Sequence, residues 1–338
     1  MLRPDRRIYG PKSPPGGPNG LSRKVGPTTV GPRGTGPRLG DVARDKGRTT
    51  AEATWHDTTV SDQGGRYDRG ATGYARCWAP VLTPAVAELL DVAEPMLSGG
   101  ERILDLGTGT GQLALQAIAR WSSVSVVGID ASAAMREIAD TDADRRLAPH
   151  DRGRFETVTA FADRLPFEDG SFDAVLSSFV FQLVPNRARA LRETRRVLRA
   201  GGLLAYVSWL DDAGRFRPDE IFDDVLDEAG IGARDGDDRS GDGRSGDVPS
   251  VQRAANELRR AGFADASARP GHLDHEFTVD EYIEFLTDFD EEALFTEMEP
   301  DLRARLLVHL RSRLSPLSAA AMTMRFPIVF VTGRRSRR

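Results

Sequence analysis

The spacing of apolar positions changes repeatedly between residues 84 and 210. Short runs rich in branched apolar residues, typical of buried strands, alternate with segments whose apolar residues recur every three or four positions, typical of helices. The predicted strands are 102–106, 124–129, 155–160, 174–178 and 203–208. The predicted helices between them are 112–120, 133–139 and 187–199. Gly201 and Gly202 are expected to cap the last of these helices in the left-handed conformation.

The alternation ends after residue 210. Residues 232–250 are polar and of low complexity, which predicts a mobile loop. Beyond it the pattern predicts helices over 251–261, 278–289 and 300–314, and two further strands at 266–270 and 324–332. Strands that alternate with helices favour an α/β fold. The expected architecture is a doubly wound, Rossmann-like, mostly parallel seven-stranded sheet with helices on both faces.

The N-terminal segment, residues 1–60, differs from the rest. It is rich in Gly, Pro and Arg and has no apolar periodicity, so it is predicted to be a disordered basic tail. Residues 1–48 hold eleven Lys and Arg against three Asp, a net +8, which leaves −13 on the remainder because the whole chain carries −5. An acidic body argues against a nucleic-acid substrate.

Composition narrows the class of protein further. The 338 residues are 39% hydrophobic and 29% charged, as in soluble globular proteins. No apolar run approaches the roughly 18 residues of a membrane span, and no hydrophobic segment follows the basic start, so neither a span nor a secretory signal is expected. The single Cys77 excludes an internal disulfide and fits a cytoplasmic location. With one cysteine and five histidines, no metal site is predicted.

The glycines after the first predicted strand are the main chemical signal. In "LDLGTGTG", Asp105 precedes Gly107, Gly109 and Gly111, whereas a dinucleotide fingerprint would need its third glycine at Gln112. A carboxylate here would repel a pyrophosphate but suits a cationic cofactor. S-adenosyl-L-methionine carries an ammonium and a sulfonium and no phosphate. The alternative is a tight turn without a ligand.

A second carboxylate supports the same cofactor. Asp130 ends the second predicted strand in "VVGID", nineteen residues after Gly111. A carboxylate at that place can accept hydrogen bonds from both hydroxyls of a ribose.

Four motifs in this order resemble the class I S-adenosylmethionine-dependent methyltransferases. They are "LDLGTGTG", "VVGID", "ADRLPFEDGSFDAVLSSFVFQLV" and "LRETRRVLRAGGLLAYVSW". The chain is most similar to the small-molecule branch that includes ubiquinone and menaquinone biosynthesis methyltransferases. The resemblance implies one methyltransferase domain over 61–338, with a cofactor-binding core over about 65–210 and an acceptor side over about 211–338. It covers the core well and the C-terminal third loosely.

The resemblance also implies a set of cofactor-binding residues. The glycine loop would lie against the amino-acid and ribose parts, with Asp105 near the ammonium and Asp130 on the ribose. Ala131 would pack on the adenine. Two tyrosines would close over the cofactor as a lid, with ordinary core aromatics as the alternative. The implied residues are Tyr67, Tyr74, Asp105, Gly107, Thr108, Gly109, Gly111, Asp130, Ala131, Phe161, Ala162, Asp163, Ser177 and Ser178.

The third motif departs from the family pattern. Where the family often has an Asp that meets the adenine amino group, this chain has Phe161. Ala162 can still donate its backbone N–H to the adenine, and Asp163 is the candidate to replace the lost carboxylate. Ser177 and Ser178 follow the fourth predicted strand and are expected to line the cavity near the transferable methyl group.

The motifs themselves name no catalytic residue. His272 and His275 are candidate bases if the C-terminal region folds over the cavity, and residues of a solvated strand edge otherwise. The implied partner is a small-molecule methyl acceptor, while the acceptor, the attacked atom and the oligomeric state stay open. The alternatives are a methyltransferase acting on RNA or protein, recruited by the basic tail, and a non-catalytic binding protein on the same fold.

Overall fold

The computed structural model describes residues 65, 67–97, 99–211, 216–231 and 247–337. The predicted tail 1–60 and residues 232–246 of the predicted loop lie outside this part of the chain. Within the described residues, no helix combines the length and apolar character needed to cross a membrane.

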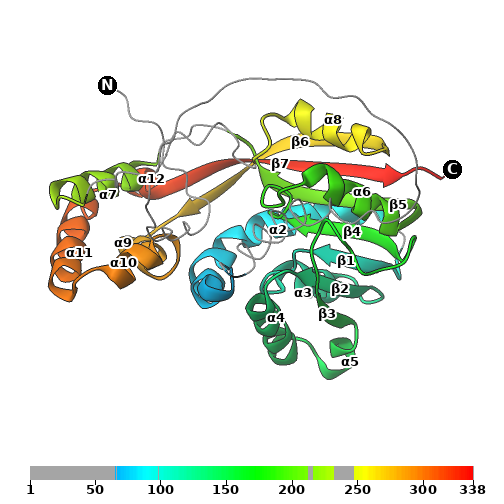
Figure 1. Ribbon diagram of the computed structural model, residues 1–338, viewed down its shortest axis with the longest axis horizontal. Coiled ribbons are helices and arrows are strands. Elements are labelled where there is room, and N and C mark those ends of the chain that lie inside the picture. Colours follow the sequence, from blue (N-terminus) through cyan, green and yellow to red (C-terminus); the bar gives the residue numbers. More distant parts are fainter. Residues whose placement is uncertain (1–64, 66, 98, 212–215, 232–246, 338) are drawn as a thin grey trace, which may run out of the picture.

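A single sheet organises the described part of the chain and confirms the predicted fold class (Figure 1). Its order is β3-β2-β1-β4-β5-β7-β6. The first five strands run parallel to one another, and β7 is antiparallel to both β5 and β6. The strands are β1 (Arg102–Leu106), β2 (Ser125–Asp130), β3 (Phe155–Thr159), β4 (Phe172–Ser178), β5 (Leu198–Trp209), β6 (Phe263–Glu276) and β7 (Thr323–Arg335).

Helices cover both faces of the sheet because successive strand residues point to opposite sides. Ile103 belongs to the apolar core under α2 and α3, whereas its neighbour Leu104 belongs to the core under α6 and α8. The helices are α2 (Ala79–Ala93), α3 (Gln112–Arg120), α4 (Ala133–Arg146), α5 (Pro149–Arg152), α6 (Arg187–Val197), α7 (Arg217–Glu228), α8 (Val251–Arg260), α9 (Val279–Phe285), α10 (Glu292–Glu297), α11 (Pro300–Leu314) and α12 (Ala319–Met322), with π-helical turns at Tyr74–Trp78 and Leu286–Asp290 and a 3₁₀ turn at Glu94–Met96.

The end of α6 corrects one prediction. The helix stops at Val197 and the next residue already begins β5, so Gly201 and Gly202 do not cap it. They lie where the pairing of β4 and β5 shifts register. Gly201 has a φ of 81°, and a Cβ on Gly202 would come 2.9 Å from the carbonyl oxygen of Asp173. The glycines therefore serve an irregularity in β5, where two backbones approach closely.

The last two strands carry a helical lobe. β6 and β7 are much longer than the predicted 266–270 and 324–332. These two strands extend beyond the other strands of the sheet. At that end lie α7, α9, α10, α11 and α12, which gather at the left of Figure 1. Aromatic side chains pack within the lobe, for example Phe222 stacked on Phe295 with ring centroids 6.0 Å apart.

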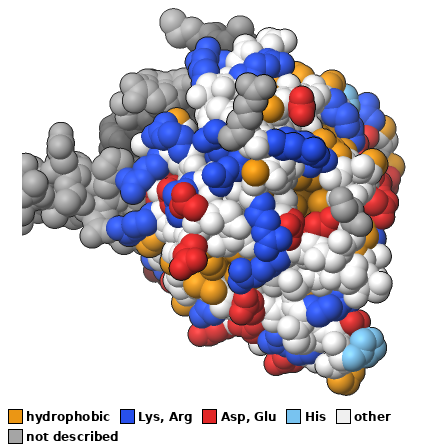
Figure 2. Space-filling view, turned by 90° about the vertical axis from the view of Figure 1, so that its right-hand side faces the viewer, with side chains coloured by type: hydrophobic (Ala, Val, Ile, Leu, Met, Phe, Trp, Pro, Cys, Tyr) orange, Lys and Arg blue, Asp and Glu red, His pale blue; other side chains and the backbone are white. Residues whose placement is uncertain are grey.

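Arginines gather at the opposite end of the molecule, where the parallel strands begin. Figure 2 looks onto this end and shows many Lys and Arg side chains. Several are bonded to helix C-termini: Arg154 donates to the carbonyls of Ile118 and Trp121 at the end of α3. Arg335 donates to Leu198 just beyond α6. Cations are stabilised at the negative end of a helix dipole, so these charges are part of the fold.

Candidate cofactor site

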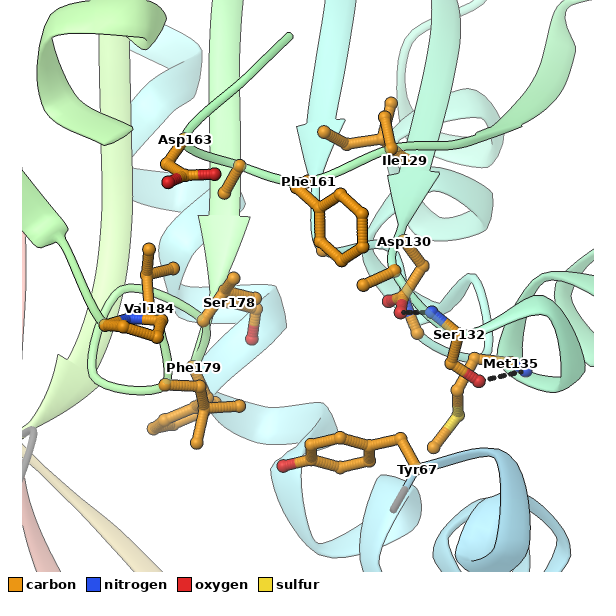
Figure 3. Close-up of a pocket in the computed structure, with 18 of the residues that line it drawn as sticks. Tyr67, Ile129, Asp130, Ser132, Met135, Phe161, Asp163, Ser178, Phe179 and Val184 are labelled. Carbon is orange, nitrogen blue, oxygen red and sulfur yellow. Dashed lines mark hydrogen bonds between the residues drawn. The ribbon is translucent and has the colours of Figure 1, made fainter. Parts of the chain in front are cut away.

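A cavity lies where the strand order reverses, between the carboxyl ends of β1 and β4. Ligands of open α/β sheets bind at this kind of position. Its empty volume is about 880 Å³, including solvent at the mouth. The loops after β1, β2, β3 and β4 supply most of the lining, and the N-terminal helical segment closes one side (Figure 3).

The three glycines after β1 perform different tasks. All have positive φ, between 53° and 83°. A Cβ on Gly107 would overlap the Val180 side chain, and one on Gly111, the N-cap of α3, would come 3.1 Å from Ala139 on α4. Gly107 and Gly109 both line the cavity, but only Gly109 has open space where a Cβ would stand. Only this glycine leaves room for a ligand to approach the backbone.

Asp130 ends β2 and is fixed by two backbone amides. Its Oδ2 accepts from the N–H of Gly109 at 2.8 Å, and its Oδ1 accepts from the N–H of Ser132 at 2.9 Å. Burial raises the pKa of this carboxyl, and the two hydrogen bonds oppose that rise. A carboxylate offers about four lone-pair sites. Asp130 itself forms part of the cavity lining.

Asp105 lies behind the glycine loop rather than in the cavity wall. It is 1% exposed, and its Oδ2 accepts from the Thr108 hydroxyl at 2.8 Å. Burial raises its pKa to about 7. Neither Asp105, Thr108 nor Gly111 is among the lining residues. These residues support the loop in which Gly109 faces the cavity.

The loop after β3 brings Phe161, Ala162 and Asp163 to the cavity. Figure 3 shows the Phe161 ring beside Asp130, with Asp163 farther along the same loop on the side away from Asp130. Arg164 places its guanidinium 5.9 Å from the centroid of the Phe161 ring. The Arg189 Nε lies 4.0 Å from the Asp163 carboxylate. The expected adenine-side residues are therefore close together.

The loop after β4 forms an apolar wall. The cavity is lined by Ser178, Phe179, Val180, Leu183, Val184 and Pro185, while Ser177 does not line it. Ser177 is fully buried and donates to the Leu106 carbonyl at 2.8 Å, because successive residues of a strand face opposite sides. Phe179 has a φ of 56°, and its ring lies 4.1 Å from that of Trp209.

Tyr67 and Tyr74 both line the cavity from the N-terminal side. Their ring centroids are 6.1 Å apart, and Tyr74 also packs edge-on against Phe289, 5.7 Å away. Burial raises the pKa of Tyr74 well above its ordinary value, and Asp130 and Asp105 add to the rise. The tyrosines therefore both line the cavity and pack against other aromatic rings.

Comparison with known proteins agrees with this geometry. Residues 104–206 match a family described as a methyltransferase domain. The ubiquinone/menaquinone biosynthesis C-methyltransferase of Geobacter sp. (strain M21) is 38% identical over 115 residues, 33% of this chain and 47% of the relative. The malonyl-[acyl-carrier protein] O-methyltransferase of Geobacter sulfurreducens is 34% identical over 230 residues, 61% of this chain and 79% of the relative. The chain belongs to the class I S-adenosylmethionine-dependent methyltransferases.

Two further findings concern the fold that the chain shares with a solved structure and the share of its relatives' length that it covers. The crystal structure of the [4+2]-cyclase SpnF superposes with a TM-score of 0.52 at 20% identity, covering 82% of this chain and 96% of the cyclase, and this likeness shows a shared fold. The chain spans about half the length of the first curated relatives it matches.

The two candidate histidines of this class I methyltransferase are not at the cavity. His272 and His275 lie on β6, the edge strand, three places from β4 in the sheet order. The His275 ring packs 4.4 Å from Phe277, and burial lowers its pKa. No group of three or more potential metal ligands occurs in the part of the chain that the structure describes.

The structure adds lining residues that the motifs did not indicate. Ile129, Ser132, Met135 and Ala160 flank Asp130, and Leu183 and Val184 extend the apolar wall. In the sequence, only the position of these residues could have indicated that they line the cavity. All of them lie at or shortly after the carboxyl end of a parallel strand of this methyltransferase.

Proposed function

We propose that this protein binds S-adenosyl-L-methionine in the cavity and transfers its methyl group to a small-molecule acceptor. One observation carries the proposal. Asp130 is held by the amides of Gly109 and Ser132 and lines the cavity beside the open space at Gly109. This arrangement suits a ribose whose two hydroxyls donate to one carboxylate.

The charge of the lining supports a cationic cofactor. Among its described residues the lining holds two carboxylates, Asp130 and Asp163, and no Lys, Arg or His. Phosphate-bearing cofactors need positive charge or free helix N-termini. An ammonium and a sulfonium fit this lining better. Asp105, buried one layer behind, adds a further acidic group on the same side.

Adenine would lie on the β3 side of the cavity in this proposal. Phe161 offers an aromatic face beside Asp130, and Ala162 lies next to it in the lining. Asp163 is the lining carboxylate nearest in sequence to the position where the family often has an Asp. We propose that it accepts from the adenine amino group.

The chemistry expected of the protein is alignment. The bound sulfonium supplies a methyl group with a good leaving group, so positioning and exclusion of water are the main requirements. Phe179, Val180 and Leu183 provide an apolar wall, and Tyr67 and Tyr74 cover the other side. These surfaces favour an acceptor with an apolar body.

The core over about 65–210 would bind the cofactor, and residues of about 211–338 would contribute to acceptor choice. Cys77 fits a reducing compartment such as the cytoplasm, where we propose the protein acts.

Titration calorimetry with S-adenosylhomocysteine tests the proposal on the wild type and Asp130→Ala. Loss of two hydrogen bonds to a charged group, each worth about 1.5–3 kcal/mol, should lower affinity by one or more orders of magnitude. Asp173→Ala is the matched control. Asp173 also accepts from a distant backbone amide, Arg102 N–H at 2.9 Å, but at the opposite ends of the strands.

The outcomes separate the alternatives. Equal affinities of wild type and Asp130→Ala would mean that the ribose binds elsewhere. Absence of binding to the wild type would overturn the proposal, and NAD would be titrated next. Binding without methyl transfer to any member of an acceptor panel would favour a non-catalytic role on the same fold.

A further inference from the structure

Asp68 links the N-terminal helical segment to the N-terminus of α4, beside the cavity. Its Oδ1 accepts from the Ser132 hydroxyl at 2.5 Å and from the Ala134 N–H at 3.1 Å. Both donors belong to the first turn of α4, which begins just after Asp130. A carboxylate at a helix N-terminus is stabilised by the free N–H groups and by the helix dipole.

Ser132 connects this contact to the ribose-side carboxylate. Its hydroxyl donates to Asp68 and also accepts from the Met135 N–H at 3.1 Å, as the N-cap of α4. Its backbone N–H donates to Asp130. The residue is 1% exposed, so its hydroxyl and amide are enclosed between the two carboxylates. One buried serine therefore joins Asp68 and Asp130.

The residue before Asp68 covers the cavity. Tyr67 lines it, and Figure 3 shows the ring across the opening from Phe161. Seven residues on, Tyr74 lines it as well. The lid, defined here as residues 67–78, has a second attachment at its far end. Arg76 forms ion pairs with Glu284, at 3.0 Å, and with Asp288.

We propose that Asp68 is a positioning residue that latches the lid over the cavity, and that this latch opens when cofactor enters or leaves. The inference rests on the proposed function for the identity of the cofactor. Asp68 is exposed and holds the lid to the N-terminus of α4, just after Asp130, whereas the Arg76 contacts hold the lid to the helical lobe. Loss of the Asp68 contacts would free the cavity end of the lid and leave its other end attached.

A capping role alone would give different results. If Asp68 only stabilised α4, its removal would lower the melting temperature and leave lid motion and cofactor release unchanged. Ser250→Ala supplies the comparison. Ser250 caps α8 by accepting from the Arg253 N–H at 3.2 Å, on a helix that does not line the cavity.

The experiment compares wild type, Asp68→Ala, Asp68→Asn and Ser250→Ala by two measurements. Hydrogen exchange on the free proteins reports opening of residues 67–78, and stopped-flow displacement reports the dissociation rate of S-adenosylhomocysteine. Removing two hydrogen bonds to a carboxylate should raise both rates in Asp68→Ala by about tenfold or more. Asp68→Asn keeps a neutral acceptor and should give a smaller rise, and Ser250→Ala should give none.

The two measurements fail in different ways. Unchanged lid exchange in Asp68→Ala, or an equal rise in Ser250→Ala, would overturn the latch. Faster exchange with an unchanged dissociation rate would also overturn it, because the lid would then not control release. If the wild type binds no S-adenosylhomocysteine, the proposed function fails, and lid exchange in the free protein still decides whether Asp68 holds the lid.

Discussion

Asparagine in place of Asp105 should make the stability of the protein respond differently to pH. Asp105 is 1% exposed, and burial raises its pKa to about 7 from an ordinary 3.8. The folded state therefore binds a proton more tightly than the unfolded state. Ionised Asp105 costs stability, and this cost is absent below pH 4, grows as pH rises, and is complete above pH 7.

The size of the effect follows from the shift. About three pKa units at 1.36 kcal/mol each amount to roughly 4 kcal/mol of stability lost by the wild type between pH 4 and pH 8. The substituted asparagine would be neutral throughout, and its carbonyl oxygen can still accept from Thr108, which now donates to Asp105 at 2.8 Å. Burial of the asparagine amide changes the stability of the variant by an amount that does not depend on pH. The stability of Asp105→Asn relative to wild type should therefore increase by up to about 4 kcal/mol over this range.

Urea denaturation of both proteins at pH 4, 5, 6, 7 and 8 measures that difference. Other carboxyl groups, including the buried Asp219, titrate in both proteins and cancel. A difference that stays flat from pH 5 to pH 8 would refute the reasoning, since Asp105 would then have an ordinary pKa despite its burial. If the stability of Asp105→Asn relative to wild type fell as pH rises, a cation or additional donors would have to stabilise the ionised form of Asp105.

Further substitutions test separate parts of the structure. Gly109→Ala should cost about 1–2 kcal/mol for its left-handed φ and weaken S-adenosylhomocysteine binding in calorimetry, because the methyl group enters open cavity space. Gly107→Ala should cost more stability through overlap with Val180, and Val180→Ala should partly restore it in thermal melts. Tyr282→Phe removes the hydroxyl that donates to Asp219 at 2.6 Å, so urea titrations should show a larger loss at pH 8, where Asp219 is ionised, than at pH 5. His272→Ala and His275→Ala should leave methyl transfer nearly unchanged, and a large loss in either would return that histidine to the site.

The parallel core was predictable because its signals are local. β1 and α3 have the predicted bounds, since a short apolar run followed by glycines and a regular apolar period identifies each element without reference to its neighbours. The helix cap at Gly201 was predicted wrongly for the converse reason. Gly201 does have a positive φ. However, its neighbour Gly202 must be a glycine because a Cβ there would approach the backbone of Asp173, a residue of the adjacent strand.

The candidate site shows the same division. Strand-end positions such as Asp130 and Ser178 could be expected at the cavity from the order of strands alone. That Ser177 faces away from the cavity could not be predicted without the orientation of its strand. Asp68 lies 64 residues before its partner Ser132, and nothing in the local pattern marks this contact. Helix α7, with the buried Phe222, also went unpredicted beside the polar segment that follows it.

The strand pairing at the base of the helical lobe has a consequence for engineering. Most of the lobe, from α9 to α12, is inserted between β6 and β7. Glu276, at the end of β6, pairs with Thr323 at the start of β7, and the Phe277 N–H donates to the Met322 carbonyl at 3.0 Å. There the chain leaves the sheet and returns to it at adjacent positions. The entropy of closing such an excursion grows only slowly with length, by about 0.6 kcal/mol per doubling. Grafts that replace α9 to α12 can therefore differ widely in size, provided that the β6–β7 junction keeps its register.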